Sequence, residues 1–343
     1  MELKETLRAL CLAQGVNGQS DAADEAAARL ATYCDRVERD RLGSVIGWRR
    51  DDGDESRPVL LLEAHIDQVG FIVTGVEETA GGGFLRVASA GGADNRVLTA
   101  AEVVVYGDRP YAGVFCSVPP HLGGGDLPPV NERYIDVGMT AEAAREHIPV
   151  GSRVGFRPRY SPLLGERVAA TSLDDRSGVA VVLRCLELLD GETLPWRVAV
   201  AFATGEELGL RGAAPVGFSV APDAAVATDV SFAMMPQEKP EECGRLGDGP
   251  MIGVAPSLDA AFSRRMAALA RAEAIPFQYE GMGETTGTDA DRLGISRGGV
   301  RMALLSIPQR YMHTAAEVVD LRDVENTARL MAAFARKEAE AVC

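Results

Sequence analysis

Four short runs of almost uninterrupted apolar residues constrain the fold of this chain more than any other feature. Runs of this length, bounded by polar residues, are typical of strands that are covered by helices on both faces. They are PVLLLEA (58–64), RVAVAFAT (197–204), AAVAT (224–228) and RMALLSI (301–307). The sequence therefore predicts a sheet buried in the middle of the protein.

Helical patterns lie before, between and after these runs. Two of them precede the first run, and the second is expected to begin at Ser20 and Asp21, which can cap free backbone N–H groups. The expected helices span about 3–13, 20–38, 175–189, 258–274 and 323–340. Strands that alternate with helices predict an α/β fold, with a mixed, largely parallel open sheet flanked by helices.

The stretch from 68 to 160 has a different character. It contains short β patterns (QVGFIVTGV, FLRVAS, AEVVVYG and YAGVFCSV), Gly-rich turns and only one short helical pattern, TAEAAREH. We therefore expect a small β-rich domain at 68–160, inserted into a core formed by residues 1–67 and 161–343. Its loop PPHLGGGDLPP (119–129) has too much Gly and Pro for regular structure.

Composition excludes several classes of protein. The 343 residues are 46% hydrophobic and 25% charged, the balance of a globular protein with a large core. A net charge of -15 without a Lys/Arg cluster argues against nucleic acid and membrane surfaces as partners. The six cysteines form no CxxC pair, and MELKETLRALC lacks the apolar stretch of a signal peptide, so we expect reduced thiols and a cytoplasmic protein.

Polar residues follow the ends of the predicted strands. Ligands of open α/β sheets bind outside the carboxyl ends of the strands, so these residues are expected to converge on one rim. They are His65 and Asp67 after the first run, Glu206 and Glu207 after the second, Asp229 after the third, His313 after the fourth, and Asp174 and Asp175 at the start of the helix at 175–189.

Two imidazoles with several carboxylates form a ligand set that suits zinc, cobalt or manganese, and a shared carboxylate would suit two such ions. Amide hydrolysis at neutral pH needs an activated water, and a bound cation lowers the pKa of water to about 7. A second cation at about 3.5–4 Å can stabilise the developing oxyanion. A carboxylate that binds no metal can then accept the proton of the water and return it to the leaving amine.

Each motif alone has a simpler interpretation. The His65–Asp67 pair after a strand is more often a polar turn than a metal site. Acidic residues such as Glu206 and Glu207 are common at solvated helix starts, and the Asp pair of LDDR also fits a helix N-cap. Only their joint placement at strand ends favours a metal site.

Six ordered blocks resemble the tetrahedral (TET) and glutamyl aminopeptidase family of dinuclear metallopeptidases. The blocks are EAHIDQVGFIV, TSLDDRSGVAVVL, FATGEELGLRGA, ATDVS, GTDADRL and IPQRYMHTAAEVVDL. The segments VPPHL and YIDVGMTAEAAREHIPVGSRVGF resemble the inserted dimerisation domain of that family. The resemblance thus covers nearly the whole chain.

The resemblance implies a role for each candidate residue. It implies that Asp174 bridges two divalent cations, with zinc the first expectation and cobalt or manganese alternatives. His65 and Asp229 would complete one site, and Glu207 and His313 the other. Glu206 would be the general base, and Asp67 would orient His65. Asp175 would shape the turn.

The family also implies peptide substrates, shortened from the N-terminus, and assembly of dimers into a tetrahedral particle of twelve subunits. Some positions depart from the family pattern. Gln68 stands where Glu is common, Gly205 stands where Gln is common, and the Lys often found before LDDR is absent. These departures leave substrate preference open, and Asp289 could contact either substrate or a neighbouring subunit.

Three other functions remain open at this point. A related dinuclear deacylase or carboxypeptidase would share the core but prefer N-acylated substrates. A glycosidase needs two carboxyls about 5–9.5 Å apart across the sugar bond, for which the adjacent Glu206 and Glu207 are a poor pair. A noncatalytic assembly protein would have no need to keep the base and every ligand.

Overall fold

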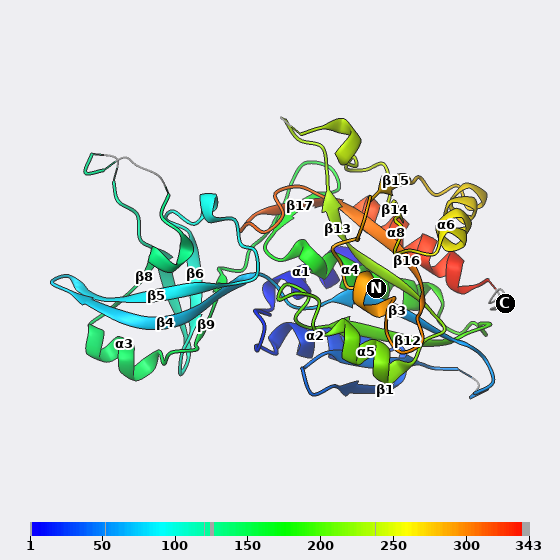
Figure 1. Ribbon diagram of the computed structural model, residues 1–343, viewed down its shortest axis with the longest axis horizontal. Helices are drawn as coiled ribbons and strands as arrows, with labels where there is room; N and C mark the ends of the chain where they lie inside the picture. The colour runs from blue at the N-terminus through cyan, green and yellow to red at the C-terminus, as the bar shows by residue number, and fades with distance from the viewer. Residues whose placement is uncertain (1, 52, 120, 124–126, 237, 338–343) are drawn as a thin grey trace.

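A computed structural model describes residues 2–51, 53–119, 121–123, 127–236 and 238–337 (Figure 1). It has two parts, a barrel on the left of Figure 1 and a larger α/β core on the right. Among the residues that it describes, no helix is both long and apolar enough to cross a bilayer.

An eight-stranded sheet forms the centre of the core. Its strands lie in the order β1 (Cys34–Arg39), β2 (Val45–Arg49), β12 (Arg197–Ala203), β3 (Val59–His65), β13 (Ala224–Phe232), β16 (Arg301–Gln309), β14 (Met251–Val254) and β15 (Gln278–Gly281). The pairs from β12 through β3 and β13 to β16 are parallel, as is β14 with β15, and the remaining pairs are antiparallel. The predicted mixed, largely parallel sheet is therefore confirmed.

Both faces of the sheet are buried, which explains the continuous apolar runs. Leu60 and Leu62 point to one face, whereas Leu61 points to the other, as strand geometry requires. The first face packs against α1 (Leu3–Leu12), α2 (Asp21–Leu30), α4 (Leu173–Leu188), α6 (Ala260–Ala272) and α8 (Leu321–Ala335). The second packs against α5 (Ala213–Val220) and α7 (Ala290–Leu293).

The second part is a closed barrel with its own core. Its strands lie in the order β4 (Gly70–Thr79), β5 (Gly82–Ala90), β8 (Tyr134–Met139), β7 (Pro110–Phe115), β6 (Glu102–Tyr106) and β9 (Arg153–Phe156). Phe71 stacks edge-to-face on Phe115 and Phe156, with ring centroids 5.0 and 5.9 Å apart. Helix α3 (Ala141–His147), capped by the Thr140 hydroxyl, packs against it. A β-rich domain thus accompanies the α/β core, as predicted.

Smaller elements complete the chain. A three-stranded sheet contains β10 (Tyr160–Pro162), β11 (Arg167–Ala170) and β17 (Glu317–Asp320). The 3₁₀ helices are η1 (Asn95–Val97), η2 (Val130–Glu132) and η3 (Pro240–Glu242). Cys11, Cys34, Cys116, Cys185 and Cys243 are free thiols. Residues 120 and 124–126 of the predicted loop, and the end of the helix predicted to reach 340, lie outside the described residues.

The helix predicted at 20–38 is wrong in its second half. Helix α2 ends at Leu30, and Cys34–Arg39 forms β1 at the edge of the sheet, followed by β2, which the sequence analysis missed. Two helices still precede the first strand, but that strand is β1. Ser20 precedes α2 without a side-chain capping bond, so its predicted cap is also wrong. Four of the six residues of β1 are charged and exposed, because an edge strand buries only part of its surface.

Candidate active site

One cavity of about 610 Å³ receives most of the residues that the sequence singled out. His65 ends β3, Glu206 and Glu207 follow β12, and Asp229 lies in β13. Because these strands are parallel neighbours, their carboxyl ends open on the same side of the sheet. The cavity is also lined by Asp174 from α4 and His313 from the loop after β16. The predicted convergence on one rim is thus seen.

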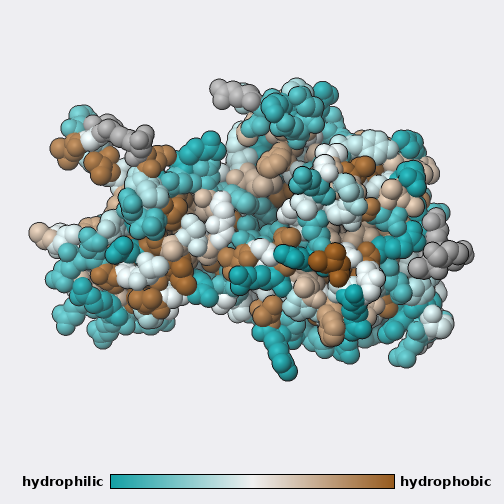
Figure 2. All heavy atoms as spheres, viewed as in Figure 1, coloured by the Kyte–Doolittle hydropathy of each residue, from teal (hydrophilic) through white to brown (hydrophobic). Residues whose placement is uncertain are grey.

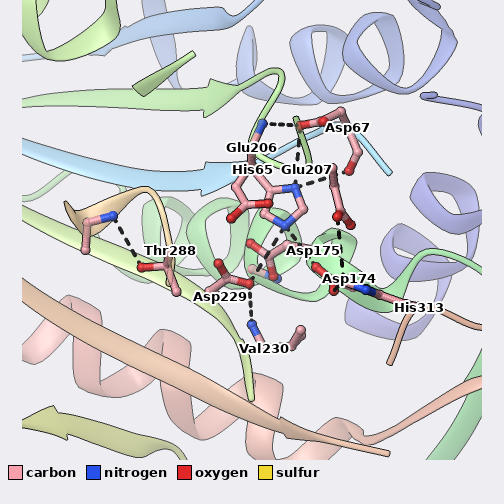
Figure 3. Close-up of polar contacts among 12 residues, drawn as sticks. His65, Asp67, Asp174, Asp175, Glu206, Glu207, Asp229, Val230, Thr288 and His313 are labelled. Atoms are coloured by element: carbon pink, nitrogen blue, oxygen red, sulfur yellow. Dashed lines mark hydrogen bonds and ion pairs between the residues drawn. The ribbon is translucent and has the colours of Figure 1, made fainter. Parts of the chain in front are cut away.

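Asp174 lies between the two imidazoles (Figure 3). Its Oδ1 atom is 2.9 Å from His65 Nε2, and its Oδ2 atom is 3.4 Å from His313 Nε2. Each oxygen of one carboxylate therefore faces a different histidine.

The potential ligand atoms form two groups, each with all atoms within 4.8 Å of one another. One contains Asp174, Glu207 and His313, and the other contains His65, Asp229 and Asp175. The second group includes Asp175, which was expected only to shape the turn. Asp175 Oδ1 does accept the backbone N–H of Gly178 at 2.8 Å, which is a turn-shaping contact.

Asp67 lies behind His65 and contacts two parts of the site. His65 Nδ1 is 3.2 Å from the backbone carbonyl of Asp67 and 3.7 Å from its carboxylate Oδ1. The same Oδ1 accepts the backbone N–H of Glu206 at 3.0 Å (Figure 3). The nearer contact to His65 is thus the carbonyl, while the carboxylate also fixes the loop that carries Glu206.

Two residues that were not predicted from the sequence position His313. Its Nδ1 atom lies 3.0 Å from the carbonyl oxygen of Gly92, in the loop that follows barrel strand β5. A proton on Nδ1 donated to this carbonyl leaves Nε2 to face Asp174. Buried Glu317 accepts the backbone N–H of His313 at 3.0 Å and that of Asp174 at 3.1 Å. The only signal for Glu317 in the sequence is its position four residues after His313.

The crowding of carboxylates and imidazoles changes their proton affinities. Burial opposes the ionisation of Asp174, but hydrogen bonds with His313 and His65 outweigh burial and hold its pKa well below the usual range. Burial lowers the pKa of His313, but its bond to Asp174 and the charge of Glu207 raise that pKa to about 9. Burial and the charge of Asp174 raise the pKa of Glu207 to about 8, and burial also raises the pKa of Glu206.

The residues of this cavity fit divalent cations. Asp175 Oδ2 and Glu207 Oε1 are buried and have no hydrogen-bond partner among the described residues. Leaving a buried acceptor unpaired is costly, and a cation bound there would remove that cost. Imidazole nitrogens and carboxylate oxygens together are ligands of zinc, cobalt and manganese.

Two of the positions that depart from the family pattern, Gln68 and Gly205, have structural explanations. The buried Gln68 side chain accepts the Gly15 N–H at 3.0 Å and a bond from Arg176 at 3.2 Å. Gly205 has a φ of +75°, which favours glycine. Asp289 is 2% exposed, so it does not lie on a surface that a neighbouring subunit would contact. The Thr288 hydroxyl caps α7 by accepting the Ala290 N–H at 3.3 Å.

This fold and this set of candidate ligands fit a metal-dependent hydrolase of the α/β type. A family model described as M42 glutamyl aminopeptidase matches residues 43–330. The chain belongs to this family of metal-dependent peptidases, and it is a hydrolase of peptide bonds.

Known relatives agree with this family. The chain is 32% identical to a lysyl aminopeptidase of Pyrococcus furiosus, over 89% of this chain and 88% of the relative. An aminopeptidase from the archaeon Desulfurococcus kamchatkensis superposes with a TM-score of 0.90 at 31% identity, covering 98% of this chain and 94% of that one. The Pyrococcus horikoshii TET1 peptidase superposes with a TM-score of 0.85 at 27% identity, covering 98% of this chain and 100% of that one. That peptidase is described as able to assemble into a tetrahedron or a large octahedral shell.

Proposed function

We propose that this protein is an aminopeptidase that uses two divalent cations to remove N-terminal residues from peptides. The observation that carries the proposal is the placement of Asp174, with one carboxylate oxygen toward His65 and the other toward His313. A carboxylate in that position is suited to bridge two cations.

The candidate ligands divide into two sets around Asp174. His65 and Asp229 would hold one cation, and Glu207 and His313 would hold the other. Zinc fits this ligand set, as do cobalt and manganese. Bound cations lower the pKa of a nearby water to about 7 and stabilise the negative charge that develops on the carbonyl oxygen of the substrate.

Glu206 is the proposed general base. It lines the cavity next to Glu207 but belongs to neither group of potential ligand atoms. Its backbone N–H is fixed by Asp67, which holds the loop in place. Burial raises its pKa, so the carboxylate readily accepts a proton from water, and the resulting acid can donate that proton to the leaving amine.

Assembly into a homo-oligomer is part of the proposal. A relative of similar fold forms closed shells, and the barrel carries exposed apolar side chains that an interface would cover. Val114, Val118 and Leu122 are 43%, 71% and 82% exposed, and Figure 2 shows hydrophobic side chains gathered over this part. We propose that the barrel mediates a dimer, which can assemble further into a tetrahedral dodecamer in the cytoplasm.

The test is hydrolysis of aminoacyl p-nitroanilides and short peptides by protein stripped with a chelator and then reloaded separately with zinc, cobalt or manganese. Release of N-terminal residues that the metal restores is the expected result. N-acetylated versions of the same peptides are the matched control, and their preferential cleavage would indicate a deacylase instead. Metal binding without turnover of either set would contradict the proposal and favour a noncatalytic role.

A further inference from the structure

A single carboxylate outside the proposed metal ligands and base projects into the same cavity. Glu280 lies on β15, at the edge of the sheet, and lines the cavity together with residues of β13 and β16. It is half-buried. Among the described residues that line this cavity, no Lys or Arg is present to neutralise Glu280.

Two serine hydroxyls fix the direction of the Glu280 carboxylate. Ser306 Oγ donates to Glu280 Oε2 at 2.5 Å, and Ser231 Oγ donates to Glu280 Oε1. Both serines are buried, so the carboxylate is held by atoms of the rigid sheet. Each carboxylate oxygen has more than one lone pair, so Glu280 can accept further hydrogen bonds.

Strand register places this carboxylate beside the proposed metal site. Ser306 of β16 is directly paired with Asp229 of β13. Ser231 lies two residues after Asp229, on the same face of the strand and about 7 Å further along it. Glu280 is therefore bonded to β13 and β16 at the level of Asp229, a proposed metal ligand.

Apolar side chains line the part of the cavity next to Glu280. Leu304 lies on the same face of β16 as Ser306, Met282 packs against the cluster that contains Leu304, and Leu210 lines the cavity as well. An apolar wall that ends in a carboxylate matches a side chain with an aliphatic stem and a cationic tip. Lysine and arginine have this form, whereas glutamate would bring a second negative charge against Glu280.

We infer that Glu280 is a specificity-determining residue that selects peptides with lysine or arginine at the N-terminus. This inference rests on the proposed aminopeptidase reaction, because it assumes that the first residue of the substrate occupies the cavity. The cationic tip donates to the Glu280 carboxylate, and the stem packs on the apolar wall.

The kinetic test compares lysyl, norleucyl and glutamyl p-nitroanilides with the metal-loaded full chain. Norleucine keeps the length of the lysine stem and lacks the ammonium group. We expect wild-type kcat/KM to rank lysyl above norleucyl and glutamyl last. Glu280→Gln should lower kcat/KM for the lysyl substrate by about 10- to 100-fold, the scale of a hydrogen bond between charged groups, and change the norleucyl value by less than about threefold.

Two further variants separate charge from structure. Glu284→Gln removes the same charge from an exposed position a few residues away, and it should leave the lysyl-to-norleucyl ratio unchanged. Glu280→Asp keeps the charge on a shorter side chain, and it should retain more of the lysyl preference than Glu280→Gln. A ratio that Glu280→Gln leaves unchanged, or that Glu284→Gln lowers equally, would overturn the inference.

A binding measurement separates this inference from the proposed function. Lysinol and norleucinol carry a free α-amine and no bond to cleave, so calorimetry reports recognition alone. Tighter binding of lysinol that Glu280→Gln abolishes would support the inference even if no substrate were hydrolysed. Equal affinity for the two amino alcohols would overturn it even in an active aminopeptidase.

Discussion

The carboxylate of Asp67 accepts the backbone N–H of Glu206 at 3.0 Å, and the same oxygen lies 3.7 Å from Nδ1 of His65. One carboxylate oxygen therefore holds the backbone of the proposed base by a hydrogen bond and places a negative charge beside a proposed metal ligand. The contact to Glu206 joins residues 139 positions apart and could not be inferred from the His65–Asp67 pair alone.

Replacement of Asp67 should affect catalysis without direct loss of a ligand. Asp67→Asn is expected to lower kcat/KM by about 10- to 100-fold, the range found when groups that orient metal ligands are changed. The backbone carbonyl that contacts His65 remains, so folding should be preserved, which circular dichroism would check. Activity equal to wild type would show that the charge of Asp67 beside His65 does not matter for turnover, since an amide oxygen can still accept the Glu206 N–H.

Adjacent residues Glu206 and Glu207 should respond differently to the same substitution. Glu206→Gln should retain metal and lose about 10²-fold or more in kcat, because it removes the proton acceptor. Glu207→Gln should reduce the metal content, measured by plasma mass spectrometry after dialysis. The assignment of the base would fail if Glu206→Gln kept full turnover.

The aspartate pair at the start of α4 offers a second matched comparison. Asp174→Asn should lose metal occupancy, because it removes the charge that both proposed sites share. Asp175→Asn should retain metal, since an amide oxygen can still accept the Gly178 N–H. Because Asp175 also lies in a group with His65 and Asp229, loss of metal from Asp175→Asn would instead identify it as a ligand.

Metal binding should strengthen as the pH rises. In the metal-free protein, the pKa of His313 is raised to about 9 and that of Glu207 to about 8, so both groups hold protons at pH 7. A cation must displace those protons, so its affinity should increase up to about pH 9. Calorimetry of zinc binding in buffers of different ionisation enthalpy measures the released protons. Binding at pH 7 without proton release would contradict this assignment of protonation states.

A site remote from the cavity predicts pH-dependent stability. Asp259 caps α6 by accepting the Ala261 and Phe262 N–H groups, and it pairs with Arg301 at 2.7 Å. Burial raises its pKa, but these contacts outweigh burial and hold the pKa below the ordinary 3.8. Its stabilisation is therefore present above about pH 4 and lost as the pH falls through the lower folded-state pKa.

Asp259→Ala should therefore lower the free energy of unfolding at pH 7 by about 1–2 kcal/mol, the usual range for loss of a helix cap. The difference from wild type should shrink below about pH 4, which urea denaturation at a series of pH values would measure. A difference that did not depend on pH would show that the charge of Asp259 contributes nothing.

The central sheet could be predicted because strands that are buried on both faces consist of continuous apolar residues. All four apolar runs are strands of the sheet, at Val59–His65, Arg197–Ala203, Ala224–Phe232 and Arg301–Gln309. Strand β1 was mistaken for helix because it forms through backbone pairing with β2 at the edge of the sheet. Such pairing does not require a regular alternation of apolar and charged residues, so the sequence of β1 shows no strand pattern.

The candidate site could be predicted in part for a related reason. Polar residues at the ends of buried strands are conspicuous, and their convergence follows from parallel pairing. The roles of Gly92 and Glu317 could not be predicted, because they act through a backbone carbonyl and through backbone N–H groups. The contact between Gly92 and His313 joins residues 221 positions apart, and neither local sequence predicts it.

The contact between Gly92 and His313 also limits how this protein can evolve. The chain leaves the core just after His65 and Asp67, forms the barrel, and returns shortly before Asp174, while the loop after β5 supports His313. A shorter descendant that deleted the barrel would keep every proposed ligand and the base. It would nevertheless lose the acceptor that fixes the His313 ring, so the barrel and the hydrolytic centre must be inherited together.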